Sequence, residues 1–276
     1  MSAPRGVDLR VRIGPMALAN PVLTASGTFG YGDEYAHVVD VAGLGAVITK
    51  TVTLEPRAGN PPRRIAETAG GMLNSIGLEN VGLAAFRRDK LPRLRRLDAT
   101  IVASVGGETP AELERLVAAL IAKLSPDVTS IADLARACEQ GGADAVTAVN
   151  TFVGMAVDLE QRGSRLGRAT GGLSGPAIKP LALARCHEAA RAIRIPVIGS
   201  GGIMNARDAL EFIAVGATAV QVGTASFIHP RAAQDVLEGL REALEARGVR
   251  RLLSWRGALS GGPSRPELIP RERRRA

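Results

Sequence analysis

The stretch IPVIGSGGIMNARDALEFIAVGATAVQVGTA, residues 195 to 225, contains two apolar runs that each lead into Gly, with a helical pattern between them. The runs IPVIGSGG (195–202) and AVQVGT (219–224) are apolar nearly throughout. Such runs are typical of parallel strands that are covered on both faces. Between them, ARDALEFIAV repeats its apolar residues at helical spacing. The stretch therefore predicts a strand, a helix and a second parallel strand.

The same pattern recurs along the chain. Five earlier runs have the same character: PVLTAS (21–26), GAVITKT (45–51), TIVASVGG (100–107), IAKLS (121–125) and AVTAVN (145–150). Helices are predicted at PAELERLVAAL, DLARACEQ and LALARCHEAARAI. Alternating strands and helices with Gly at the strand ends favour a (βα)8 barrel over an open doubly wound sheet. The runs predict seven strands, however, where a closed barrel of this kind has eight.

One junction between a helix and a strand carries no turn residue. A capping box at residues 109–112, TPAE, begins a helix that extends to about Leu120, and Ile121 begins the next strand at once. A connection from a helix to the next strand needs a few residues, usually with Gly at the helix end. We therefore expect that strand 4 and helix 4 are missing between these two residues. The alternative is a helix that stops short with frayed ends.

Composition points to a globular chain with an unusual end. The 276 residues are 46% hydrophobic and carry a net charge of +8, of which residues 247–276 contribute +7 through nine Arg and two Glu. We predict a barrel domain over residues 1–246 and a basic, disordered tail over residues 247–276. A basic tail can also contact RNA, an anionic membrane or an acidic partner.

Several functions are not indicated. No apolar run is long enough to span a membrane, and the N-terminus lacks a secretory pattern, so we expect a cytoplasmic protein without a nucleic-acid partner. Cys138 and Cys186 both lie in helical patterns and are expected to pack rather than react. The three His residues, at 37, 187 and 229, lack the spacing of metal ligands, so no protein-bound metal is expected.

Polar residues at the strand ends indicate an anionic ligand. Gly201, Gly202, Gly223 and Thr224 follow the last two strands, where barrels of this kind usually bind phosphate. Lys50 and Lys123 end apolar strands, where each could meet a substrate carboxylate or a flavin oxygen, or else extend to solvent. Asn74 and Asn150 suit a planar, amide-like ligand, or are turn residues.

Taken together, six motifs resemble the FMN-dependent class 1 dihydroorotate dehydrogenases, most closely the type 1B catalytic subunit, over roughly residues 8 to 245. They are TASGTFGYGDEY, VITKTVTLEPRAGNPPRRI, GGMLNSIGLEN, GGLSGPAIKP, IPVIGSGGI and QVGTA. The resemblance implies a barrel that oxidises dihydroorotate to orotate in pyrimidine biosynthesis by hydride transfer to FMN. It also implies a homodimer and a partner subunit that carries FAD and an iron-sulfur cluster and passes electrons to NAD.

The resemblance also implies the site residues. The implied FMN contacts are Ser26, Lys50, Thr51, Lys123, Val149, Gly175, Gly201, Gly202, Gly223 and Thr224. The implied orotate contacts are Lys50, Asn74, Ser75, Ile76, Gly77, Leu78, Asn150 and Thr151. Ser104 stands where some relatives carry Asn near the flavin.

One departure from the family concerns the catalytic base. The family has a strand that ends in a motif like N-x-S-C-P-N, whose Cys takes the proton from C5 of dihydroorotate, and this strand belongs to the unit that is missing here. No base is therefore assigned, Lys50 has a supporting role, and impaired turnover is expected. Two alternatives remain. One is a non-catalytic flavin-binding or partner-binding subunit. The other is a phosphate-binding isomerase or lyase barrel, for which the sequence supplies no acid/base pair.

Overall fold

The computed structural model describes residues 6–106 and 120–259, and seven short parallel strands form its central wall. Five of them lie in one sheet, in the order β3 (Val22–Thr24), β15 (Ala219–Val222), β14 (Val197–Ser200), β9 (Ala145–Ala148) and β8 (Ile121–Lys123). β4 (Val47–Ile48) pairs with β7 (Ile101–Val102), and a bridge from Leu23 to Ala46 joins β4 to β3. All seven strands coincide with predicted runs, so the barrel-type arrangement of parallel strands is confirmed.

The two ends of this wall meet the predicted gap. Among the described residues, β7 pairs only with β4 and β8 only with β9, so the wall has an edge at each of these strands. β8 is anchored at its start, because the Leu120 N–H donates to Asp144 Oδ2 over 3.0 Å and the Asp144 N–H donates to the Leu120 carbonyl over 2.8 Å. The helix predicted over residues 110–120 lies outside the described residues except at Leu120.

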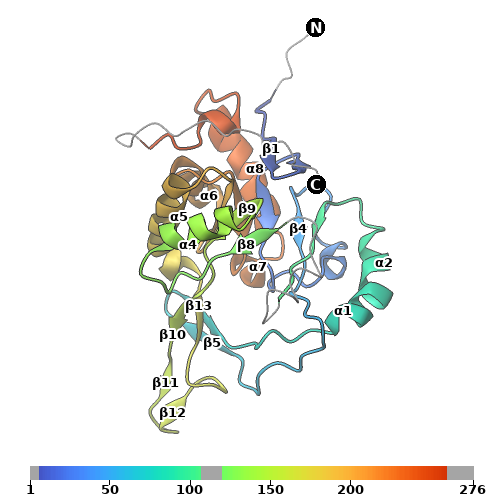
Figure 1. Ribbon diagram of the computed structural model, residues 1–276, viewed down its shortest axis with the longest axis vertical. Coiled ribbons are helices and arrows are strands. Elements are labelled where there is room, and N and C mark those ends of the chain that lie inside the picture. The colour runs from blue at the N-terminus through green and yellow to red at the C-terminus, as the bar shows by residue number, and fades with distance from the viewer. Residues whose placement is uncertain (1–5, 107–119, 260–276) are drawn as a thin grey trace.

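Helices cover the outer face of the wall (Figure 1). They are α4 (Ile131–Gln140), α5 (Lys179–Ala192), α6 (Ala206–Ala214) and α8 (Ala232–Glu245), whereas the short α7 (Ala225–Ile228) follows the carboxyl end of β15. Side chains of Ser130 and Asn205 cap α4 and α6 by accepting from backbone N–H groups three residues on. Phe212 and Leu240 are fully buried where these helices pack, so apolar burial fixes the helix positions.

A second, antiparallel sheet was not predicted. It has the order β10 (Phe152–Gly154), β13 (Gly171–Ser174), β6 (Gly71–Asn74) and β5 (Ile65–Thr68). The hairpin of β11 (Val157–Asp158) and β12 (Gly163–Ser164) extends from it, at the lower left of Figure 1. Two of these strands contain the Gly-rich motifs GGMLN and GGLSG, whose low β propensity hid them.

Shorter elements complete the fold. β1 (Val11–Ile13) and β2 (Met16–Leu18) form a hairpin. α1 (Gly82–Ala85), η2 (Phe86–Lys90) and α2 (Leu91–Leu94) make one continuous helical segment beside β4 and β7. The single turns η1 (Asp33–Tyr35), η3 (Pro176–Ile178) and η4 (Leu252–Ser254) lie in connections.

The predicted boundary after residue 246 needs correction. The Asp8 N–H donates to the Arg250 carbonyl and the Leu252 N–H donates to the Asp8 carbonyl, both over 2.9 Å. Leu252 is fully buried, and the Gly257 N–H donates to the Ile213 carbonyl over 3.0 Å. Residues 250–259 therefore belong to the barrel body, because their few apolar side chains pack despite the basic composition. Residues 260–276 lie outside the described residues.

Candidate functional site

A cavity of about 720 Å3 lies at the carboxyl ends of the parallel strands, between them and the antiparallel sheet. A volume of this size is in the range of small-molecule and cofactor sites. Every residue that the sequence predicted for cofactor or substrate lines this one cavity: Ser26, Lys50, Thr51, Asn74, Ser75, Ile76, Gly77, Leu78, Lys123, Val149, Asn150, Thr151, Gly175, Gly201, Gly202, Gly223 and Thr224. The tertiary structure therefore brings together residues up to 198 positions apart in the chain, from Ser26 to Thr224.

One side of the cavity carries a group of unpaired backbone donors. Gly201, Gly202 and Ile203 follow β14, and Gly223 and Thr224 follow β15. In the described part of the chain, the N–H groups of these five residues donate to no protein atom. Gly202 needs to be glycine, because its φ is +72° and a Cβ there would lie 2.7 Å from the Lys179 Cβ. Such a concave set of N–H groups is suited to an anion.

A second group of backbone donors lines the cavity at residues 76–78. Within residues 6–106 and 120–259, the N–H groups of Ile76, Gly77 and Leu78 also lack an acceptor. Gly77 has a φ of +75° and Leu78 a φ of +54°. A positive φ is uncommon for leucine. The buried Asn80 holds the end of this segment, since its side chain accepts from the N–H groups of Thr53 and Gly82. The cavity thus offers two separate sets of donors.

Two lysines face the cavity without a counter-ion. Neither the Lys50 nor the Lys123 ammonium has an ion pair or hydrogen bond among the described residues. Lys123 lines the cavity and is exposed by its accessible surface. Although this surface is accessible, the protein atoms packed near the ammonium lower the pKa of Lys123 below its ordinary value, because the charged form is less well solvated there than in water. An anionic or oxygen-rich ligand would compensate for that loss of solvation.

Hydroxyl groups connect the ends of three neighbouring strands. Ser26 Oγ donates to the Thr49 carbonyl over 3.0 Å and lies 3.0 Å from Thr51 Oγ1, which lies 2.9 Å from Ser104 Oγ. Ser26, Thr51 and Ser104 all line the cavity. Their chain of hydrogen bonds fixes this wall, and each hydroxyl keeps acceptor capacity for a ligand.

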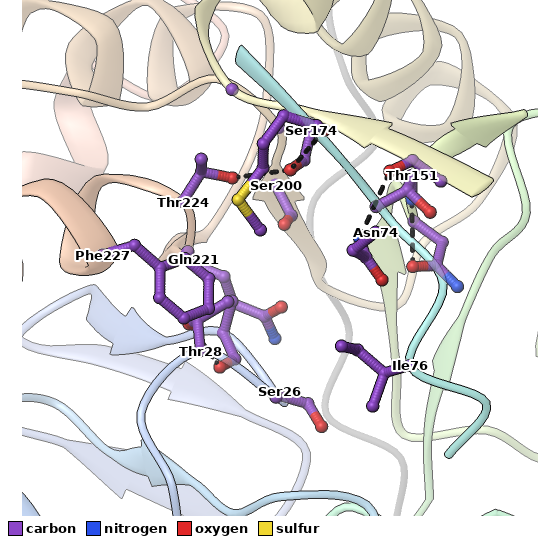
Figure 2. A pocket seen from close by; sticks show the side chains of 18 of the residues that line it. Ser26, Thr28, Asn74, Ile76, Thr151, Ser174, Ser200, Gln221, Thr224 and Phe227 are labelled. Atoms are coloured by element: carbon purple, nitrogen blue, oxygen red, sulfur yellow. Dashed lines mark hydrogen bonds between the residues drawn. The ribbon is translucent and has the colours of Figure 1, made fainter. Parts of the chain in front are cut away.

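Amide and hydroxyl groups form the opposite wall, where Asn74 and Thr151 lie side by side (Figure 2). Asn74 Nδ2 donates to the Gly172 carbonyl over 3.2 Å, and the Thr151 N–H donates to Asn150 Oδ1 over 2.9 Å. Gly172, in β13, lies directly against Thr151, since a Cβ there would be 2.1 Å from Thr151 Oγ1. The antiparallel sheet therefore sets the positions of these polar side chains.

Sequence reasoning missed several residues of the wall. Thr224 Oγ1 donates to Ser174 Oγ over 2.9 Å, and Figure 2 shows this pair on the side of the cavity away from Asn74. Gln221 is buried and its Oε1 accepts no hydrogen bond from the described residues, although it lines the cavity. Phe227 is about half exposed at the same wall. Ser174 lies in the motif GGLSG and Gln221 in a predicted strand. The sequence therefore indicated where these residues are in the fold, but not that their side chains face the cavity.

The described residues show neither a cysteine at the cavity nor a metal-binding cluster. Cys138 lies on α4 and Cys186 on α5, both outside the parallel wall, and neither lines the cavity. Among residues 6–106 and 120–259, no group of three His, Cys, Asp or Glu side chains is arranged to hold a metal ion. In the same ranges no helix has the length and apolar character needed to cross a membrane.

Comparison with known proteins identifies the family. The family model described as dihydroorotate dehydrogenase matches residues 8–120 and 111–244 of this chain, which is most of its length. The chain belongs to the dihydroorotate dehydrogenase family. The resemblance seen in the six motifs is thus confirmed at the level of the family, and the isomerase or lyase alternative is set aside.

The curated relatives of this dehydrogenase family are close. The chain is 48% identical over 300 residues to a protein of Trichlorobacter lovleyi named dihydroorotate dehydrogenase B (NAD(+)), catalytic subunit, with 92% of this chain and 99% of that protein covered. A protein of Geotalea uraniireducens with the same name is 44% identical, with 91% and 98% covered. A crystal structure of the dehydrogenase of Eimeria tenella in complex with ferulenol shares the fold, with a TM-score of 0.73 and 22% identity over 93% of this chain and 90% of that one.

The same comparisons bear on the junction between Leu120 and Ile121, which carries no turn residue. The match to the family model comes in two segments, residues 8–120 and 111–244, which overlap at residues 111–120 directly before the junction. The alignment to the Trichlorobacter lovleyi protein is 300 positions long, whereas 92% of 276 residues is about 254 residues, so about 46 positions of that dehydrogenase have no counterpart here. This shortfall, together with the position of β7 and β8 as edge strands, each paired on one side only among the described residues, supports the absence of one βα unit.

Proposed function

We propose that the chain is an FMN-binding catalytic subunit of a type B dihydroorotate dehydrogenase, whose turnover is lowered by the absence of one βα unit. The observation that carries this proposal is the convergence, on one cavity, of two unpaired lysines and two separate sets of backbone donors. The names of the Trichlorobacter and Geotalea proteins, which describe the same activity, support it.

The residues present fit a flavin phosphate. The N–H groups of Gly201, Gly202 and Ile203, with those of Gly223 and Thr224, are assigned to the phosphate. Lys123 and the orphaned Oε1 of Gln221, one donor and one acceptor, are assigned to the polar edge of the flavin ring. When bound there, FMN would supply the hydride-accepting chemistry that no amino-acid side chain provides.

The opposite side of the cavity fits dihydroorotate. Its carboxylate is assigned to the free N–H groups of residues 76–78 and to the Lys50 ammonium. The side-chain amides of Asn74 and Asn150, each with a donor and an acceptor, are assigned to the ring amide groups. These residues bind and orient the substrate, while no described side chain stands out as the base for its C5 proton.

The direct test is anaerobic reduction. Purified protein is reconstituted with FMN, dihydroorotate is added without oxygen, and the absorbance of oxidised flavin is followed. Slow bleaching, far below that of the Trichlorobacter lovleyi protein measured alongside, is the expected result. Bleaching at the relative's rate would refute the impairment. Stable flavin binding without any bleaching would favour the second candidate, a non-catalytic flavin-binding subunit. The described residues that line the cavity include no cysteine, which agrees with this candidate.

The proposed partners follow from the relatives' names. A protein called a catalytic subunit implies a further subunit, and we assign to it the FAD and the iron-sulfur cluster that would carry electrons to NAD. We also propose that the chain forms a homodimer. Size-exclusion chromatography with light scattering, with and without the partner subunit of the Trichlorobacter lovleyi enzyme, would show a dimer and a larger complex; a monomer under both conditions would contradict these assignments.

Replacing Gly172 by Ala should separate the two sides of the cavity. The added Cβ would overlap the Thr151 side chain, so Thr151 must move and the substrate wall changes. We expect orotate to bind about tenfold more weakly to the FMN-loaded protein, a loss of about 1.4 kcal/mol, with FMN affinity unchanged. Orotate titration monitored by the flavin spectrum measures this. Equal losses of orotate and FMN binding would show that the two sides are not independent.

A further inference from the structure

A cluster of three charged side chains lies behind the loop that follows β14. Lys179 Nζ donates to Asp208 Oδ1 over 2.6 Å and to Glu211 Oε2 over 2.9 Å. Lys179 is the first residue of α5, and the two acids lie in the first two turns of α6. Asp208 is buried, and the side chains of Lys179 and Glu211 are about a quarter and a third exposed. The cluster therefore joins the beginnings of two helices that flank one loop.

The loop at residues 201–204 is held by this cluster from both sides. Asp208 uses its second oxygen, Oδ2, to accept from the Met204 N–H over 2.9 Å, and its own N–H donates to Asn205 Oδ1 over 3.1 Å. On the other side, Gly202 packs on the stem of Lys179, with room for no Cβ between them. Lys179 thus fixes the direction of the carboxylate that holds the end of the loop.

The loop presents the N–H groups of Gly201, Gly202 and Ile203, which lack protein acceptors in the described structure. Preorganised donors bind an anion more strongly than donors that must be ordered on binding. We propose that Lys179, Asp208 and Glu211 act as positioning residues that hold the 201–204 loop in its phosphate-binding conformation, an inference that rests on the proposed FMN binding. None of the three acidic or basic groups lines the cavity, so their effect on the ligand is through the backbone of the loop.

The test compares two flavins that differ only in the phosphate. Dissociation constants of FMN and riboflavin are measured by flavin fluorescence for the unsubstituted protein and for Lys179→Met, which keeps the apolar stem but removes the ammonium. We expect FMN to bind about tenfold more weakly, as when one charge-assisted hydrogen bond is lost, and riboflavin affinity to change by less than about twofold, since it makes no phosphate contact. Lys179→Arg should restore most of the FMN affinity.

Controls separate positioning from folding. Arg136→Met removes an exposed ion pair with Asp133 on α4 and should leave both affinities unchanged. If Lys179→Met does not fold, Glu211→Gln leaves the Lys179–Asp208 pair intact and should give a smaller shift in the same direction. Equal losses of FMN and riboflavin affinity, or no loss of either, would overturn the inference. If the unsubstituted protein binds neither flavin, the proposed function itself fails and the inference fails with it.

Discussion

Replacement of Lys123 by Met is expected to weaken flavin binding and to slow flavin reduction by dihydroorotate by about 10² to 10³-fold, the usual cost of removing one donor aimed at developing charge. Lys123 projects from β8 into the cavity and has no counter-ion in the described structure. Reduction of a flavin bound as proposed would place negative charge in the cavity, where the Lys123 ammonium would stabilise it. FMN titration and anaerobic stopped-flow absorbance measure the two effects.

The same substitution should stabilise the protein without flavin. Desolvation by the surrounding protein lowers the pKa of Lys123 in the folded state. At pH values between this lowered pKa and the ordinary one, the folded protein therefore binds fewer protons than the unfolded chain. The free energy of unfolding therefore rises with pH through that window. At lower pH, Lys123 is charged in the folded state and destabilises it. Lys123→Met removes this cost, and we expect a higher thermal midpoint at neutral pH for the flavin-free variant, with a weaker dependence on pH above neutrality.

Lys90→Met serves as the matched control. Lys90 lies 4.8 Å from the Tyr31 ring centroid and 3.5 Å from Glu34, and it does not line the cavity. This variant should keep its flavin affinity and lack the gain in stability. If Lys123→Met bound and reduced flavin like the unsubstituted protein, the assignment of Lys123 to the flavin would be wrong.

Restoring the missing segment should have the largest effect on turnover. We assign the roughly 46 positions of the Trichlorobacter lovleyi protein that lack a counterpart here to the gap expected between Leu120 and Ile121. Inserting them there should supply the fourth strand, its helix and the base-bearing loop that the family resemblance implies. Proton abstraction by a positioned base contributes about 10² to 10⁴-fold. We expect the rate of anaerobic flavin bleaching by dihydroorotate to rise by a factor in this range.

Two further variants show which part of the segment acts. A flexible Gly/Ser insertion of equal length should give no gain, because it supplies neither the strand nor the base. The restored segment with its loop Cys changed to Ala should raise the unfolding temperature, since it would pair with the edges that β7 and β8 have among the described residues, yet leave bleaching slow. A rate that equals the relative's before any insertion would contradict both expectations.

Sequence alone predicted the parallel wall and most of the cavity. Runs such as IPVIGSGG and AVQVGT are apolar because both faces of their strands are covered, and their Gly residues mark the ends where ligands bind. The gap expected at Leu120 was inferred because a connection from a helix back to a strand usually needs a few turn residues. These features depend on residues that are close together in the chain, so short stretches of sequence are enough to predict them.

Only the tertiary structure decided how distant residues combine. Gly172 sits against Thr151, Lys179 ties Asp208 to the loop before α6, and Leu252 packs into the barrel from a segment whose charge predicted a disordered tail. Each depends on contacts between elements that are far apart in the chain. The lowered pKa of Lys123 is of the same kind, since it comes from the protein atoms packed near the ammonium and not from its neighbours in sequence.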